Sequence, residues 1–224
     1  MVLVHGSVTN GAITWMAQRP LAERFTLVVV DRSGYPPGPP LEHIDFEVQA
    51  AELAELLEPG DHLVAHSYGG VIALLAAPEA ELGSLTVIEP PAFGVARGHA
   101  GVEEFLEHFY AAPSNPRSYL EFFLPLVGSK MKLPEPLPPG IEAGARAALA
   151  ERPPHEARIP LDELFAAPYR KLVVSGAHSD ALDAVCAVLE QRLAAERAVL
   201  QGAGHSIPRA NGFNEVLAEF LLRA

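Results

Sequence analysis

Cysteine is nearly absent from this chain, since Cys186 is the only one among 224 residues. A single cysteine cannot form an internal disulfide, and such sparse use is typical of proteins from a reducing compartment. The chain also lacks an apolar run long enough to cross a membrane, and no basic-then-apolar signal peptide precedes its first apolar run. These absences predict a cytoplasmic protein.

Basic residues are scarce as well. The 16 Lys and Arg residues are outnumbered by 28 Asp and Glu residues, which gives a net charge of −12. An acidic chain without a basic run has no electrostatic attraction for nucleic acid or for an anionic membrane surface. The chain has no Cys-x-x-Cys pair and no Gly-x-Gly-x-x-Gly after a strand. We therefore expect no metal and no cofactor, and a small molecule rather than nucleic acid or a membrane as the partner.

Apolar residues, in contrast, make up 49% of the chain, which is enough for a sizeable core. Many of them form short runs that are apolar on both faces, as is typical of parallel strands covered by helices on both sides. These runs lie at 2–4, 25–31, 62–65, 85–89, 171–175 and 197–201. Apolar residues at helical spacing lie between or after them, at 46–57 behind the candidate N-cap Asp45, at 181–194 and at 213–222. This alternation predicts an α/β fold with a doubly wound, mostly parallel sheet.

One segment, residues 94–168, interrupts the alternation because it contains no convincing strand. Aromatic residues recur in it at helical spacing, and we interpret it as a helical cap inserted before the penultimate strand. The core is then formed by residues 1–93 and 169–224. An insertion at the carboxyl edge of a parallel sheet lies over the ligand crevice, so Phe122 and Phe123 are candidate substrate-binding residues. Adjacent helical residues point about 100° apart, so we expect one of the two to pack inward and the other to border the pocket.

The stretch LVAHSYGG, residues 63–70, changes abruptly from an apolar strand to a glycine-rich helix start. Ser67 stands at the corner, where such a turn lifts the hydroxyl above the edge of the sheet. Ala65 and Gly69, two positions to either side, are small enough for the backbone to pass close to itself. The usual pattern is Gly-x-Ser-x-Gly, from which Ala65 departs mildly. The stretch therefore predicts a nucleophile elbow, with Ser67 as the nucleophile at a helix N-terminus that favours a developing oxyanion.

With this elbow, the chain resembles the α/β-hydrolase fold family along nearly its whole length. VLVHGS (2–7) is similar to the family's strand and oxyanion loop, and VVVDRSGYPPGP (28–39) is similar to its Asp-x-x-Gly loop. LVVSGAHSD (172–180) is similar to the strand and loop that usually carry the catalytic acid. GAGHSIPR (202–209) is similar to the loop that carries the catalytic histidine.

The resemblance implies roles for individual residues. It implies that His205 is the general base, and that the backbone N–H groups of Ser7 and Tyr68 hold the oxyanion. The order of serine, acid and histidine along the chain matches the family's order. The resemblance also implies that the first two strands usual in the family are missing, because the chain starts directly on the strand at 2–4.

The acid has three candidates. The family's usual Gly-x-x-Asp spacing, counted from Gly176, falls on Ser179 instead of an aspartate. Asp180 is one residue late and Asp183 four residues late, and either could instead cap a helix or complement its dipole. Glu89 lies at the carboxyl end of the preceding strand, where some family members place their acid. We expect Asp180 to be the acid, ahead of Glu89 and then Asp183, and any of them could serve if it reaches the histidine.

The resemblance therefore implies a serine hydrolase with a helical cap, acting through a Ser-His-acid triad on a small, mainly apolar ester or related acyl substrate. Two alternatives follow from the same fold. One is other chemistry, such as carbon–carbon bond hydrolysis or perhydrolysis. The other is a non-catalytic small-molecule receptor, because a fold alone does not decide a function.

Overall fold

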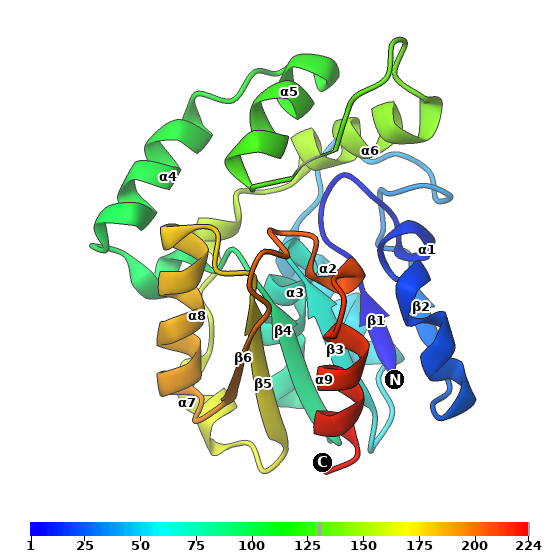
Figure 1. Cartoon of the computed structure of the whole chain (residues 1–224), viewed down its shortest axis with the longest axis vertical. Coiled ribbons are helices and arrows are strands. Elements are labelled where there is room, and N and C mark those ends of the chain that lie inside the picture. The colour runs from blue at the N-terminus through cyan, green and yellow to red at the C-terminus, as the bar shows by residue number, and fades with distance from the viewer. Residues whose placement is uncertain (130, 224) are drawn as a thin grey trace.

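A six-stranded, wholly parallel sheet forms the centre of the molecule (Figure 1). The computed structural model describes residues 1–129 and 131–223. The strand order is β2-β1-β3-β4-β5-β6. The strands are β1 (Val2–Val4), β2 (Val28–Val30), β3 (His62–His66), β4 (Ser84–Ile88), β5 (Arg170–Ser175) and β6 (Glu196–Val199). This topology confirms the predicted α/β fold with a doubly wound sheet.

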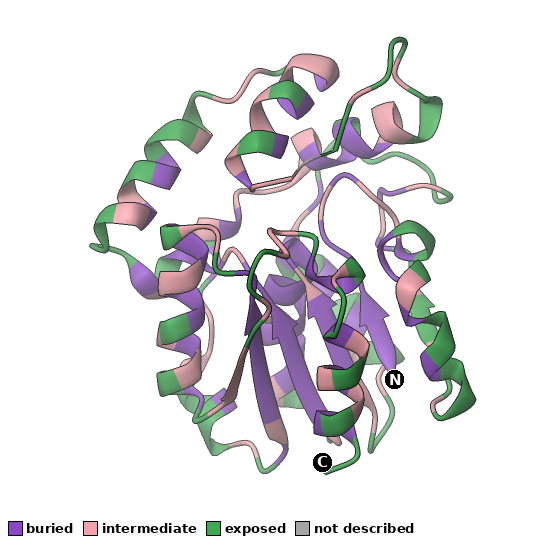
Figure 2. Cartoon of the chain, viewed as in Figure 1, coloured by how far each residue is buried: buried purple, intermediate pink, exposed green. Residues whose placement is uncertain are grey.

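Helices cover both faces of the sheet, because successive side chains of each strand point to opposite faces. On one face lie α2 (Phe46–Leu56), α3 (Tyr68–Ala76) and α8 (Asp180–Arg192), and on the other lie the 3-10 segment η1 (Met16–Glu23) and α9 (Phe213–Leu221). Val2 and Val4 of β1 belong to the first core, whereas Leu3 belongs to the second. Figure 2 shows the resulting continuous burial of the inner strands between the two helical layers.

Two details test the sequence patterns. The side chain of Asp45 accepts a hydrogen bond of 2.7 Å from the amide of Glu47, which confirms it as the N-cap of α2. The run at 25–31, however, is not buried on both faces, since Val28 and Val29 are 39% and 41% exposed. The physical reason is position, because β2 lies at one edge of the sheet and, among the described strands, pairs with β1 alone.

Between β4 and β5, the described residues form helices and add no strand to the sheet. The helices are α4 (Ala100–Tyr110), α5 (Pro116–Leu126), α6 (Pro139–Ala150) and α7 (Leu161–Ala166). Helices α4, α5 and α6 lie over the carboxyl ends of the strands, whereas α7 packs against α8 at the side of the sheet (Figure 1). Of the helices that the structure describes, none has both the length and the apolar character that crossing a membrane would require.

Helix α5 shows why this segment is helical. Asn115 caps it, accepting hydrogen bonds from the amides of Arg117 and Ser118, and Pro116 occupies the first helical position, where its missing N–H is not needed. The apolar face of α5 then packs on α6, with Tyr119, Leu120 and Leu124 against Ala145 and Ala148. The carboxyl edge of the sheet is thereby covered by an apolar layer.

Candidate active site

Ser67 lies at the corner between β3 and α3, with φ 53° and ψ −127°. A positive φ is a strained conformation for serine, and the sharp turn of a nucleophile elbow requires it. Two glycines leave room for the turn. A Cβ on Gly69 would collide with the carbonyl oxygen of His5, and a Cβ on Gly6 would come within 2.7 Å of the Cβ of Ser67. The strand, turn and helix that LVAHSYGG predicts are thus all present.

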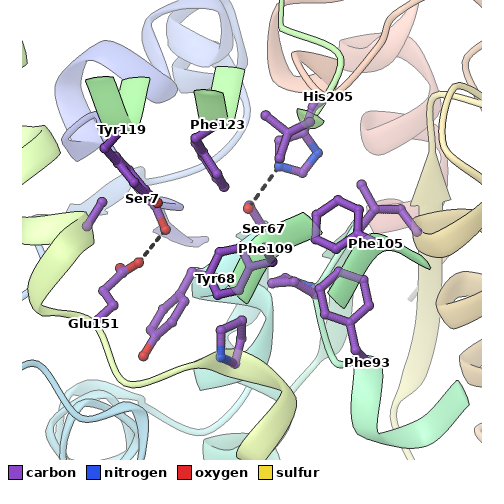
Figure 3. A pocket seen from close by; sticks show the side chains of 15 residues that line it. Ser7, Ser67, Tyr68, Phe93, Phe105, Phe109, Tyr119, Phe123, Glu151 and His205 are labelled. Carbon is purple, nitrogen blue, oxygen red and sulfur yellow. Dashed lines mark hydrogen bonds between the residues drawn. The ribbon is translucent and has the colours of Figure 1, made fainter. Parts of the chain in front are cut away.

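His205, from the loop between β6 and α9, lies between a hydroxyl and a carboxylate. Its Nε2 is 2.9 Å from Ser67 Oγ, a contact drawn in Figure 3, and its Nδ1 is 2.7 Å from Glu89 Oε2. His66 contacts the backbone of His205, because His66 Nε2 donates a hydrogen bond of 2.8 Å to the carbonyl oxygen of His205. Burial, followed by the neighbouring His205, lowers the pKa of His66 to about 3. His66 is therefore neutral near pH 7 and serves to position His205.

Glu89 directly follows β4, is fully buried and has a φ of 43°. Its Oε1 accepts a hydrogen bond of 2.7 Å from the amide of Gly176, and His178 Nδ1 lies 3.3 Å from the same oxygen. Burial by itself raises the pKa of Glu89, but these contacts and the bond to His205 outweigh burial and lower it to about 2. An ionised Glu89 keeps the proton of His205 on Nδ1 and leaves Nε2 free to accept from the hydroxyl of Ser67.

This geometry corrects the expected order of the three acids. Asp180 is the exposed first residue of α8, which Ser179 caps, so its carboxylate complements the helix dipole. Asp183, in the same first turn, pairs with Arg197 at 3.4 Å. Among the described residues, Glu89 is the carboxylate that hydrogen-bonds His205. The reason is topological, since β4 and β5 end side by side and Glu89 emerges at their common edge.

The amides of Ser7 and Tyr68 lie next to Ser67. Tyr68 is the first residue of α3, so its N–H has no acceptor within the helix. In the described part of the chain, the N–H of Ser7 has no hydrogen-bond acceptor either. Both residues line the same cavity as Ser67 (Figure 3). Two such amides at the positive end of a helix can hold a negative charge that develops on a carbonyl oxygen.

His5 and Arg32 fix the loop that carries Ser7. His5 Nδ1 donates to the carbonyl oxygen of Gly6 at 2.7 Å, and His5 Nε2 accepts from the amide of Arg32 at 3.1 Å. Burial, followed by the charge of Arg32, lowers the pKa of His5 to about 3, so the ring is neutral and can accept. Arg32 Nη1 also donates to the carbonyl oxygen of Gly6, at 3.0 Å.

Glu151, which follows α6, reaches the same loop from the helical segment above. Its Oε2 accepts a hydrogen bond of 2.6 Å from Ser7 Oγ, as Figure 3 shows. Its Oε1 accepts from Arg32 Nη2 at 2.6 Å and from the Tyr35 hydroxyl at 2.9 Å. Sequence reasoning missed this residue. Its stretch, AERPP, contains no recognisable motif, and its place in the site depends on how α6 lies across the sheet.

A cavity of about 50 Å³ opens above Ser67, and its walls are largely apolar. Phe123 lines it and stacks on Tyr119, with 5.2 Å between the ring centroids. Phe122 is half-buried on the neighbouring helix face and is not part of the lining, so of the two candidate substrate-binding residues Phe123 is the one that borders the cavity. The other aromatic lining residues are Tyr68, Phe93, Phe105, Phe109 and Tyr119.

One group of residues in the described ranges could hold a metal ion, namely Glu89, His178 and His205, whose donor atoms lie within 4.8 Å of one another. Both nitrogens of His205 already take part in hydrogen bonds, to Ser67 and to Glu89. His178 Nε2 donates to the carbonyl oxygen of Val127 at 3.0 Å. The proton on His205 Nδ1 is donated to Glu89 and the lone pair on Nε2 accepts from Ser67, so His205 is arranged for proton transfer at Ser67.

The fold and this array define a class of protein, one with an open parallel α/β sheet and a serine, a histidine and a carboxylate joined at its carboxyl edge. Residues 1–219 match the family model described as the alpha/beta hydrolase family. The chain belongs to that family.

Curated proteins that resemble the chain are named as esterases. The chain is 28% identical to the pimeloyl-[acyl-carrier protein] methyl ester esterase of Aliivibrio fischeri (strain MJ11) over 109 residues. The matched stretch covers 47% of this chain and 42% of that protein. The match thus spans less than half the length of this relative.

Solved structures are similar over the whole chain. A membrane phospholipase A described as a bacterial virulence factor has a TM-score of 0.76 at 24% identity, covering 99% of this chain and 78% of that one. The 2-hydroxy-6-oxo-6-phenylhexa-2,4-dienoate hydrolase of Rhodococcus sp. strain RHA1 has a TM-score of 0.70 at 22% identity, covering 100% and 90%. At these identities the likeness is one of fold.

Proposed function

We propose that this protein is a serine hydrolase that cleaves a small, mainly apolar carboxylic ester. The observation that carries the proposal is the hydrogen-bonded series Ser67, His205 and Glu89 at a strained strand–helix corner. Membership of the alpha/beta hydrolase family and partial similarity to a methyl ester esterase support the same reaction class.

The acylation step uses each of these groups. His205 Nε2 takes the proton of Ser67 as the serine oxygen attacks the ester carbonyl carbon. Glu89 stays ionised, holds the ring and stabilises the imidazolium that forms. The carbonyl oxygen becomes an oxyanion next to the amides of Ser7 and Tyr68. The proton then passes from His205 to the leaving oxygen, the carbon–oxygen bond breaks, and an alcohol departs from the acylated Ser67.

Deacylation repeats the same steps with water. His205 takes a proton from a water molecule that attacks the acyl carbon, and it returns that proton to Ser67 Oγ as the carboxylic acid is released. No redox partner or cofactor enters this balance. The reaction consumes one ester and one water and yields one acid and one alcohol.

The cavity supports a small acyl group. A cavity needs a volume of roughly 10–15 Å³ to hold one water molecule. The cavity of about 50 Å³ above Ser67 therefore accommodates a short acyl chain of a few heavy atoms. Its aromatic walls, which include Phe93 and Phe123, favour an apolar chain because burying apolar surface is favourable.

The proposal is tested by reacting the protein with a fluorophosphonate probe and with a panel of p-nitrophenyl esters of increasing acyl length. We expect the wild type to be labelled and to prefer short acyl chains. Ser67→Ala should lose both labelling and turnover while keeping its circular dichroism spectrum. The matched control is Ser114→Ala, at an exposed serine between α4 and α5, which should behave as the wild type. Labelling that persists in a folded Ser67→Ala variant would contradict the proposal, and so would a wild type that binds small ligands without reacting.

A further inference from the structure

The carboxylate of Glu151 lies in the wall of a largely apolar cavity, on the side of Ser7 (Figure 3). Its side chain is only 6% exposed. Buried carboxylates are rare unless they are paired, because burial of an isolated charge is costly. Both oxygens of Glu151 accept hydrogen bonds, Oε1 from Arg32 and Tyr35 and Oε2 from Ser7, and Ser7 lines the cavity as well.

Arg32 fixes the direction of the hydrogen bond between Glu151 and Ser7. The buried guanidinium of Arg32 donates to Glu151 Oε1 at 2.6 Å, and the hydroxyl of Tyr35 donates to the same oxygen at 2.9 Å. A carboxylate in an ion pair has no proton to give. In the 2.6 Å contact with Glu151 Oε2, Ser7 Oγ must therefore be the donor. Its proton is committed, and its lone pairs remain as acceptors.

The same residue carries the amide that the proposed function places on the carbonyl oxygen of the ester. The backbone nitrogen and Oγ of Ser7 belong to one residue and lie close together. When the ester's carbonyl oxygen is held by the Ser7 N–H, the first carbon of the acyl chain therefore lies near Ser7 Oγ. A hydroxyl on that carbon can donate to Ser7 Oγ, whereas a methyl group there leaves the lone pairs of Ser7 Oγ without a donor. A carboxylate at that position would face the like charge of Glu151 and be disfavoured.

We propose that Ser7 Oγ, held as an acceptor by Glu151, selects acyl groups with a hydroxyl next to the scissile carbonyl, so that the preferred substrates are esters of small 2-hydroxy acids. This inference rests on the proposed function, since it takes the ester carbonyl to lie at the Ser7 amide. It adds a specificity-determining contact to the three residues that perform the reaction.

The test compares two esters of equal size, the p-nitrophenyl esters of 2-hydroxypropanoic acid and of 2-methylpropanoic acid, in which a hydroxyl replaces a methyl group. The readout is the ratio of their kcat/KM values in the wild type and in Ser7→Ala. The inductive effect of the hydroxyl on the carbonyl is the same for both proteins and cancels. We expect Ser7→Ala to lower the ratio by about tenfold, the effect of one lost hydrogen bond. Ser7→Thr, which keeps a hydroxyl, should restore it.

Glu151→Gln gives a second readout, a gain of activity toward an ester that can only accept a hydrogen bond. An amide in place of the carboxylate can donate to Ser7 Oγ, which frees the serine proton to point into the cavity. The variant should then lose its preference for the 2-hydroxy ester and gain activity toward the 2-methoxypropanoate ester, which offers only an acceptor. Removing this charge also leaves Arg32 buried without its ion pair, so the variant is less stable. If it does not fold, the comparison of Ser7→Ala with Ser7→Thr decides the matter alone.

Binding of the matching amides, 2-hydroxypropanamide and 2-methylpropanamide, separates this inference from the proposed function. An NMR titration reads the contact without hydrolysis. A preference for the hydroxy amide that disappears in Ser7→Ala supports the Ser7 contact even if neither ester is hydrolysed, in which case the proposed function alone is wrong. Ester hydrolysis with a ratio unchanged by Ser7→Ala would overturn the inference and leave the proposed function in place. Equal binding of both amides to the wild type would overturn it as well.

Discussion

Glu89 and His205 are 116 residues apart in the chain, and they meet at the carboxyl edge of the sheet, where Glu89 Oε2 accepts a hydrogen bond of 2.7 Å from His205 Nδ1. Glu89 reaches this position because it follows the end of β4 with a positive φ, which turns the chain sharply at the strand end. The amide of Gly176, at the end of the neighbouring β5, then holds the second carboxylate oxygen. Two adjacent strand ends thus fix the carboxylate that the histidine contacts.

The first prediction concerns this carboxylate. We expect Glu89→Gln to lower kcat by about 10⁴-fold, because a neutral amide favours the wrong tautomer of the histidine and cannot stabilise its charged form. The matched controls, Asp180→Asn and Asp183→Asn, should keep nearly full activity, since neither carboxylate hydrogen-bonds the histidine. Ester turnover of the three purified variants checks this. A greater loss in Asp180→Asn than in Glu89→Gln would restore the order expected from the sequence.

The second prediction concerns the close approach of two loops at the nucleophile. A Cβ added at Gly6 would lie 2.7 Å from Ser67 Cβ and 3.3 Å from its Oγ. Gly6→Ala must therefore displace the serine, and a misplacement of about 1 Å can cost 10²-fold in rate. We expect a fall in kcat of that order. Gly140→Ala is the control, because an added Cβ there meets no atom of the described residues within 4 Å. Equal kcat values for the two variants would show that the loop yields without moving Ser67.

The third prediction concerns the cavity wall. Phe123 lines the cavity and stacks on Tyr119, whereas Phe122 lies on the neighbouring face of α5. We expect Phe123→Ala to shift the preferred acyl group toward longer chains, because the space left by the ring adds to the cavity. Phe122→Ala should leave the chain-length profile unchanged. The p-nitrophenyl ester panel measures both. A shift caused by Phe122→Ala and not by Phe123→Ala would contradict this prediction, because it would show that Phe122 is the residue that borders the cavity.

The elements of the fold could be predicted from the sequence because each depends on local patterns. The apolar runs fix the strands, and a side chain such as Asp45 marks a helix start through a contact only two residues away. The partner of His205 could not be predicted in the same way. Spacing along the chain places Asp180 near the expected position, but which carboxylate faces the histidine depends on how β4 and β5 end beside each other.

The wall of the cavity was harder still to predict. Helical periodicity shows that Phe122 and Phe123 point in different directions, but only the packing of α5 on α6 decides which of them faces Ser67. Glu151 gave no signal at all, since its partners, Ser7 and Arg32, are more than a hundred residues away in the sequence.

The last prediction concerns acid stability and the buried ring of His5. Burial and the charge of Arg32 lower the pKa of His5 from 6.5 to about 3 in the folded protein. Between these two pH values the unfolded chain binds a proton at His5 that the folded protein does not, so the free energy of unfolding falls as the pH falls. One such proton changes the free energy of unfolding by about 1.4 kcal/mol per pH unit.

His5→Asn removes this titrating imidazole. We expect the variant to be less stable than the wild type at pH 7, because the Arg32 amide loses its acceptor, and the difference to shrink as the pH falls toward 4. Urea unfolding at pH 7, 6, 5 and 4 measures the difference, with His43→Asn, at a largely exposed histidine, as the control. If the difference between wild type and His5→Asn stays constant over this range, His5 is not held neutral by its burial, and the loop beside Ser67 is not fixed in the way that the contacts of His5 indicate.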